Sequence, residues 1–248
     1  MLVAAAVCPC PPLLVPQVAA GAAPELDAAR AACADALGVL AAARPDLLVV
    51  IGPDDPGTGT DTAGTDTRWY AQGAPGTFRG FGVDVDVRLG SPAAESGVER
   101  SPALPASLAV GAWLLEHTGW SDAPIEGLSV REPIPAERCI EVGRAVAARA
   151  ARVALLVMAD ASACRTLKAP GYLDERAEPF DTAVAHALAT ADTATLKTLD
   201  PTLAHTLKAA GRPAWQVLAG AGEAASLAAS LLYEAAPYGV GYLVATWS

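Results

Sequence analysis

Four short segments of the chain carry a thiol, a hydroxyl or a carboxylate next to small residues or proline. They are Cys8-Pro9-Cys10-Pro11-Pro12, Ile51-Gly52-Pro53-Asp54, Ala159-Asp160-Ala161-Ser162-Ala163 and Gly220-Ala221-Gly222-Glu223. Each lies at the end of an apolar run or the start of a helical pattern, where α/β proteins assemble their sites from loops. Sulfur and carboxylate groups in such loops could bind a metal ion or transfer protons.

The first two segments each allow two interpretations. Cys8 and Cys10 flank a proline after an apolar run, and both could be small buried hydrophobic residues. As thiolates they would be soft ligands for Zn²⁺ or another thiophilic ion. Asp54 follows a Gly-Pro turn, where its carboxylate could bond to nearby backbone amides or bind a metal.

The other two segments also each allow more than one interpretation. Asp160 and Ser162 form a turn after an apolar run, so they either stabilise that turn through hydrogen bonds or belong to a site. We assign them as the candidate catalytic residues. Glu223 lies in a helical pattern of mostly alanine and leucine, so its carboxylate needs solvent, a partner or a metal ion.

The elements that must position these segments alternate between strand and helix patterns. Continuous apolar runs, typical of strands covered on both faces, predict strands at residues 2–7, 46–51, 125–130 and 153–158. An alternating pattern predicts an edge strand at 82–88, and a β-rich run closes the chain at 239–247. Helical patterns cover residues 24–43, 105–117, 135–151, 180–189, 193–199, 201–210 and 215–234.

A long segment between these elements is expected to be irregular. Residues 54–79 are rich in glycine, threonine and aspartate, and we expect a loop that carries Trp69 and Tyr70 and serves as a lid or binding loop. The alternation of strands and helices predicts a single-domain α/β protein of 248 residues. Its expected architecture is a three-layer sandwich with a mostly parallel central sheet.

The order and spacing of several stretches resemble those of a known family. The stretches are Pro11-Pro12-Leu13-Leu14-Val15-Pro16, Asp160-x-Ser162, Phe180-Asp181 and Gly220-x-Gly222-Glu223. In them, and over most of its length, the chain resembles the class III extradiol ring-cleavage dioxygenases of the subunit-B type. It also resembles their non-oxygenase relatives, the Memo-like proteins. The resemblance implies the α/β fold of that family.

The resemblance also implies a metal site. In the family, two histidines and a glutamate hold ferrous iron, and a further histidine acts as acid and base. Carried over by position, the iron ligands correspond to Cys10, Asp54 and Glu223, and the further histidine corresponds to Ala163. Only the glutamate matches the family. The implied cofactor is a divalent metal, Zn²⁺ or Fe²⁺, held by Cys10, Asp54 and Glu223.

The replaced ligands change the charge of that site. Two neutral imidazoles and a carboxylate leave a divalent ion with one net positive charge, whereas a thiolate and two carboxylates leave one net negative charge. A dianionic catecholate would then meet strong repulsion, and loss of the acid/base group would cost on the order of 10²–10⁴ in rate. We therefore expect no ordinary catechol cleavage. His117, His186 and His205 are expected on helices away from the four segments.

The sequence thus predicts a divergent dioxygenase-like protein that binds a metal or a small ligand at a reworked site. Two alternatives stay open. One is an active enzyme, either a ring-cleavage dioxygenase or a metal-assisted hydrolase that uses Asp54 or Glu223 as its base. The other is a non-enzymatic scaffold whose surface binds a protein partner.

Composition narrows the expected partners and compartment. A net charge of −10 argues against nucleic acid and anionic membranes as partners. The sequence has no stretch of about 20 uninterrupted apolar residues, the length that is needed to span a bilayer. The first residues lack a basic region, and prolines interrupt their apolar run, so we expect no export signal. Together with five cysteines, an odd number, this predicts a cytoplasmic protein. Apolar helices could form a homodimer interface.

Overall fold

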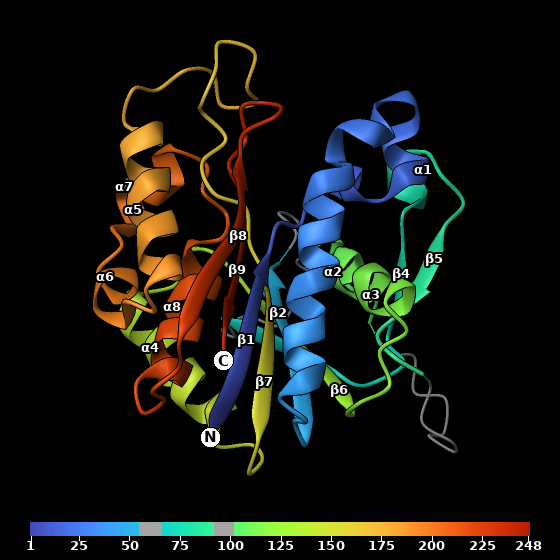
Figure 1. Cartoon of the computed structure of the whole chain (residues 1–248). Coiled ribbons are helices and arrows are strands. Elements are labelled where there is room, and N and C mark those ends of the chain that lie inside the picture. Colours follow the sequence, from blue (N-terminus) through green and yellow to red (C-terminus); the bar gives the residue numbers. More distant parts are fainter. Residues whose placement is uncertain (55–65, 92–101) are drawn as a thin grey trace.

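A seven-stranded sheet with helices on both faces forms the centre of the molecule (Figure 1). The computed structural model describes residues 1–54, 66–91 and 102–248. The strand order in the sheet is β3-β6-β2-β7-β1-β9-β8. These strands are β1 (Leu2–Cys8), β2 (Leu47–Pro53), β3 (Thr67–Tyr70), β6 (Ile125–Val130), β7 (Val153–Met158), β8 (Ala229–Ala235) and β9 (Tyr242–Trp247).

The four central strands are parallel to one another. β1 pairs with β7, β7 with β2, and β2 with β6, while β3, β9 and β8 pair antiparallel with their neighbours at the two sides. Every residue of β7 is buried, and alternate side chains of β2 enter two different cores: Val49 on one face, Val50 on the other. The structure confirms the expected α/β class with a largely parallel centre.

Two groups of helices cover the two faces of the sheet. On one face lie α2 (Asp27–Ala42) and α3 (Ala106–His117), preceded by the short α1 (Pro16–Ala19). The helices of the other face are α4 (Ala136–Ala147), α5 (Ala177–Ala189), α6 (Thr193–Lys197), α7 (Pro201–Thr206) and α8 (Arg212–Gly222). α2 shows why these residues form helices: its buried side chains, such as Ala29, Cys33, Leu37 and Leu40, recur every three or four residues.

The expected helix at 215–234 is wrong in its second half. α8 ends at Gly222, and Ala229–Ala235 instead forms β8, an edge strand that pairs antiparallel with β9. Alanine and leucine favour helix locally, but this segment alternates between half-buried and exposed positions and gains its backbone hydrogen bonds from β9. Tertiary pairing therefore overrides local propensity, and it moves Glu223 from the interior of a helix to its end.

The expected loop at 54–79 contains strands. Residues 55–65 lie outside the described residues, but Thr67–Tyr70 forms β3, which pairs antiparallel with β6. Further along, β4 (Pro75–Thr77) pairs with β5 (Asp86–Arg88) in a separate two-stranded sheet, so the strand expected at 82–88 is shorter. Trp69 is a strand residue, and the guanidinium carbon of Arg149 lies 4.2 Å from the centroid of its ring.

Candidate functional site

The four parallel strands end at one edge of the sheet, at the top in Figure 1. After β1 the chain continues to α2 on one face, whereas after β7 it continues to α5 on the other face. Open α/β sheets bind ligands where neighbouring strands send their connections to opposite sides. Cys10 follows β1 and Asp160 follows β7, so both lie at this switch point.

Asp160 and Cys10 are in direct contact. The backbone N–H of Cys10 donates a hydrogen bond to Oδ1 of Asp160 at 2.8 Å, and the Cys10 side chain also hydrogen-bonds to this carboxyl group. Asp160 is only partly exposed, and burial raises its pKa to about 6, against the opposing effect of both hydrogen bonds. A carboxyl group in this state can gain or lose a proton near neutral pH.

Tyr242 is the third polar side chain at this place. It opens β9, the strand next to β1, and it is buried. Burial raises the pKa of Tyr242, and the charges of Asp160 and Cys10 raise it further. Tyr242 therefore remains a neutral phenol that interacts with both predicted residues.

Ser162 has a structural role in the loop after β7. Its backbone N–H and its hydroxyl donate to Oδ1 and Oδ2 of Asp181 on α5, each at 2.8 Å, and both side chains are buried. Nη1 of Arg165 donates to the same Oδ2 at 3.1 Å. Of the two interpretations of Ser162, the structure favours the hydrogen-bonding one. This residue positions the loop that carries Asp160 by joining it to α5.

Asp54 follows β2, the strand next to β7, and it forms an ion pair with Arg131. Its side chain is 4% exposed, and Oδ2 accepts hydrogen bonds from Nη2 and Nε of Arg131 at 3.1 and 3.3 Å. Asp54 follows β2 and Cys10 follows β1, with β7 between them. Strands two positions apart in a sheet are roughly 10 Å apart, so β7 and its Asp160 separate these two predicted ligands.

Glu223 lies at the opposite edge of the sheet. The helix α8 starts beside Asp160, where the N–H of Gly211 donates to the Asp160 carbonyl at 2.9 Å, and its 11 residues run away from there. At about 1.5 Å per residue, its end is roughly 16 Å distant. There Glu223 accepts from Nε of Arg144 at 2.5 Å and pairs with Nζ of Lys197 at 2.6 Å.

The structure therefore does not assemble the implied metal ligands Cys10, Asp54 and Glu223. Across residues 1–54, 66–91 and 102–248, no group of three or more His, Cys, Asp or Glu side chains could hold a metal ion. The prediction that Glu223 lies at the site is wrong, because Gly220 in the Gly-x-Gly pattern before it serves helix packing. A Cβ on Gly220 would lie 2.3 Å from the carbonyl oxygen of Ile140, so this glycine lets α8 approach α4 closely.

Glu223 should therefore contribute to stability rather than to a site. Its hydrogen bonds from Arg144 and then Lys197 lower its pKa from 4.5 to about 2. This contribution is present above pH 4.5 and is lost as the pH falls towards 2. We expect Glu223→Gln to lower the free energy of unfolding by about 1 kcal/mol at pH 7.

Urea denaturation at pH 7 measures this effect of Glu223→Gln. Glu141→Gln is the matched control, because Glu141 forms an exposed ion pair with Arg138 and its loss should change little. A Glu223→Gln protein as stable as the control would contradict the assignment.

Two cysteines besides Cys10 have packing roles. Cys8 is buried, and a hydrogen bond with Cys33 of α2 together with burial raises its pKa well above the ordinary value. Cys164 is also buried, and its Sγ lies 3.4 Å from the carbonyl oxygen of Leu207. For Cys8 the structure supports the interpretation as a small buried residue, and Cys164 is buried in the same way.

The three histidines are placed as expected. His117 ends α3, and its ring stacks on Trp113 with ring centroids 4.0 Å apart. Because the first turn of α3 contacts β2 through the Ser107 hydroxyl, which donates to the Pro53 carbonyl at 2.5 Å, His117 lies at the far end of that helix. His186 on α5 and His205 on α7 are exposed.

Sequence reasoning missed the contacts that Asp181, Arg131 and Tyr242 make near the candidate site. Asp181 carried a usable signal: it lies four residues after Ala177 and three before Val184, both of which are apolar and buried. A carboxylate on the apolar stripe of a helix needs a partner. Arg131 and Tyr242 carried no comparable signal, because their contacts depend on which strands are neighbours.

Comparisons with known proteins give a fold but no family. No family model and no curated protein matches the chain. Among solved structures it is similar to uncharacterized protein JW3007 from Escherichia coli K12, with a TM-score of 0.56 and 14% sequence identity. The match covers 99% of this chain and 100% of that one. At this identity the likeness shows a shared fold alone.

No helix of the described residues is long and apolar enough to cross a membrane.

Proposed function

We propose that this protein is a divergent relative of the class III extradiol dioxygenases that binds a small polar ligand at Cys10, Asp160 and Tyr242. Asp160 exchanges a proton with this ligand, and ordinary catechol cleavage does not take place. The observation that carries the proposal is the position of Asp160. It is a partly exposed carboxyl group at the switch point, held by the N–H of Cys10 at 2.8 Å.

The surroundings of Asp160 support a role in proton transfer. With a pKa of about 6, the group is present in both protonation states near neutral pH. Its loop is fixed on one side by Ser162 and Asp181 and on the other by the hydrogen bond from Gly211. A group whose position is fixed in advance loses little entropy when a ligand binds.

A small ligand is favoured over the metal that the resemblance implies. The three implied metal ligands do not fit one ion together, since Glu223 pairs with Arg144 and Asp54 pairs with Arg131. In the ionised form Asp160 can accept a proton or a hydrogen bond from a hydroxyl or amide of the ligand, while Tyr242 keeps its own proton.

Fragment binding followed by NMR tests the proposal. We expect phenol- and amide-bearing fragments to shift the backbone amide resonances of Cys10, Asp160 and Tyr242 at pH 7.5. Asp160→Ala should weaken the best of these fragments about tenfold, because a hydrogen bond to a charged group is lost. Asp35→Ala, which removes an exposed carboxylate from α2, is the matched control and should leave the affinity unchanged.

Two results would overturn the proposal. If no fragment of a chemically diverse set moves these resonances, the switch point is not a binding site. If the protein loaded with Fe²⁺ converts catechol to a ring-fission product with matching oxygen uptake, the chain is an ordinary member of the dioxygenase class.

A further inference from the structure

A hollow of about 680 Å³ lies beside the carboxyl edge of the sheet, outside the Asp160 site. The loop that follows β7 forms one wall with Arg165, Leu167 and Lys168. The turn that joins β8 to β9 forms the other wall with Pro237 and Tyr238. Its volume is in the range of pockets that hold small molecules, about 300–1,000 Å³.

Hydrogen bonds hold the two walls together. The N–H of Arg165 donates to the Gly239 carbonyl at 3.0 Å. The Arg165 guanidinium is anchored on Asp181 at 3.1 Å, and the Tyr238 hydroxyl donates to Glu25 at 3.0 Å. The hollow is therefore preformed, so binding in it requires little ordering of the chain.

The charge of this hollow is unlike that of the chain as a whole. The lining, which consists of described residues, holds two cations, Arg165 and Lys168, and no carboxylate, although the chain has a net charge of −10. Arg165 pairs with Asp181 at 3.1 Å and with Glu178 at 3.3 Å, so Lys168 supplies the positive charge that is left for a ligand.

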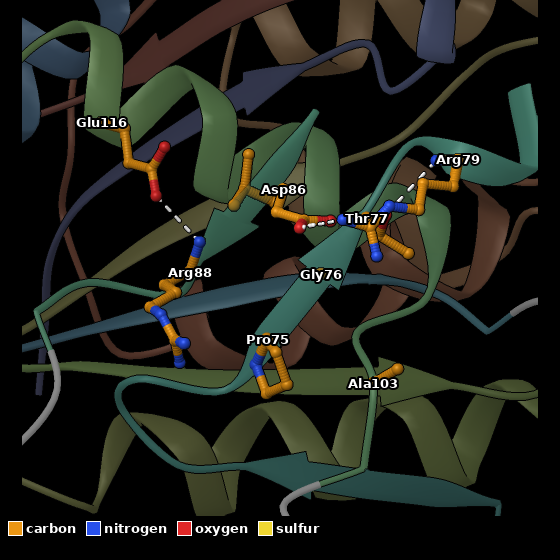
Figure 2. A pocket seen from close by; sticks show the side chains of 9 residues that line it. Pro75, Gly76, Thr77, Arg79, Asp86, Arg88, Ala103 and Glu116 are labelled. Carbon is orange, nitrogen blue, oxygen red and sulfur yellow. Dashed lines mark hydrogen bonds and ion pairs between the residues drawn. The ribbon is translucent and has the colours of Figure 1, made fainter. Parts of the chain in front are cut away.

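The hollow beside β4 and β5, by contrast, has carboxylates in its lining: Asp86 pairs with Arg79 at 2.7 Å, and Glu116 accepts a hydrogen bond from the backbone N–H of Arg88 (Figure 2). A further hollow beside α5 is lined by Glu175 and Asp200 as well as Arg176.

Apolar side chains complete the hollow and are unusually exposed there. Leu167 is 61% exposed and Leu173 is 45% exposed, and both line it. Tyr172, between them in sequence, is 63% exposed. Exposed apolar groups that cluster beside polar ones mark binding surfaces more often than isolated ones do.

We propose that this hollow binds a small organic anion with an apolar body, of the aryl carboxylate class. The anionic group lies against Lys168, and the ring lies against Leu167, Leu173 and Pro237. This inference does not depend on the proposed function of Asp160, since none of the lining residues belongs to the Asp160 site.

A ¹⁹F NMR titration with 4-(trifluoromethyl)benzoate tests the inference on the full chain. We expect saturable binding with a Kd on the order of 1 mM, typical of a ligand of this size. Lys168→Gln should weaken binding about threefold, as for one exposed charge, and Leu167→Ser should weaken it at least as much. The neutral analogue 4-(trifluoromethyl)benzyl alcohol should bind about threefold more weakly than the carboxylate.

Control variants outside the hollow test whether the loss of binding is specific to its lining residues. Arg138→Gln removes one positive charge from an exposed site on α4, and Leu232→Ser shortens an exposed leucine on β8; both should bind like the unmodified chain. Asp160→Asn should also bind like it, which separates this hollow from the switch point. Equal binding of the carboxylate and the alcohol would overturn the inference. So would equal effects of Lys168→Gln and Arg138→Gln, or an absence of binding at about 10 mM ligand.

Discussion

Replacing Asp160 by asparagine should make the protein more stable relative to the unmodified chain as the pH rises from 4 to 7.5. Burial raises the pKa of Asp160 from 3.8 to about 6, so the folded state holds this proton more tightly than the unfolded state does. Between these values the folded chain binds more protons, and its stability falls as the pH rises. Asparagine has no such proton, and it keeps an acceptor for the Cys10 N–H.

The expected size of this stability difference follows from the two pKa values of Asp160, in the unfolded and in the folded state. The interval from 3.8 to about 6 corresponds to at most about 3 kcal/mol, of which about 2 kcal/mol falls between pH 4 and pH 7.5. Urea denaturation of both proteins over this pH range measures the difference in the free energy of unfolding. Asp35→Asn on the exposed face of α2 controls for the change in net charge. A stability difference that stays flat or falls with rising pH would contradict the assigned state of Asp160.

Removing the Asp181 carboxylate should be the most destabilising single change near the site. It is 1% exposed and accepts three hydrogen bonds, from the N–H and the hydroxyl of Ser162 and from Arg165. In Asp181→Ala these donors lose their acceptor while the Arg165 charge remains partly buried. Breaking such a pair typically costs about 3–5 kcal/mol.

Glu178→Ala is the matched control for Asp181→Ala. Glu178 is also on α5 and also pairs with Arg165, at 3.3 Å, but its side chain is 75% exposed. Its removal should cost less than about 1 kcal/mol. Chemical denaturation measures both variants, and hydrogen exchange at the Ser162 amide reports on the loop. If the two variants are equally stable, the Asp181 network does not hold the loop that carries Asp160.

The position of Asp160 could be predicted because it follows a strand that the sequence marks clearly. Residues 153–158 are continuously apolar, and the strand has these bounds in the structure. The strand expected at 125–130 was also correct. A run that is buried on both faces must end where the first polar residue reaches the sheet edge. The same argument placed Cys10 close to the end of β1.

The structural role of Ser162 could not be predicted from the sequence. A serine two residues after an aspartate is compatible with a turn and with a catalytic pair. The choice depends on Asp181, which is 19 residues further along the chain and reaches Ser162 only because α5 covers this face. The local sequence contains no information about that approach.

The continuous apolar runs by themselves determined the α/β class and the position of Asp160 after the end of a strand, because such runs must be covered on both faces. Only the tertiary structure decided that Ala229–Ala235 is a strand and which charges meet. Arg144 and Glu223 are 79 residues apart in sequence, and Arg131 and Asp54 are 77 apart. Pairs at such separations depend on strand order and helix packing, which a local pattern of residues does not encode.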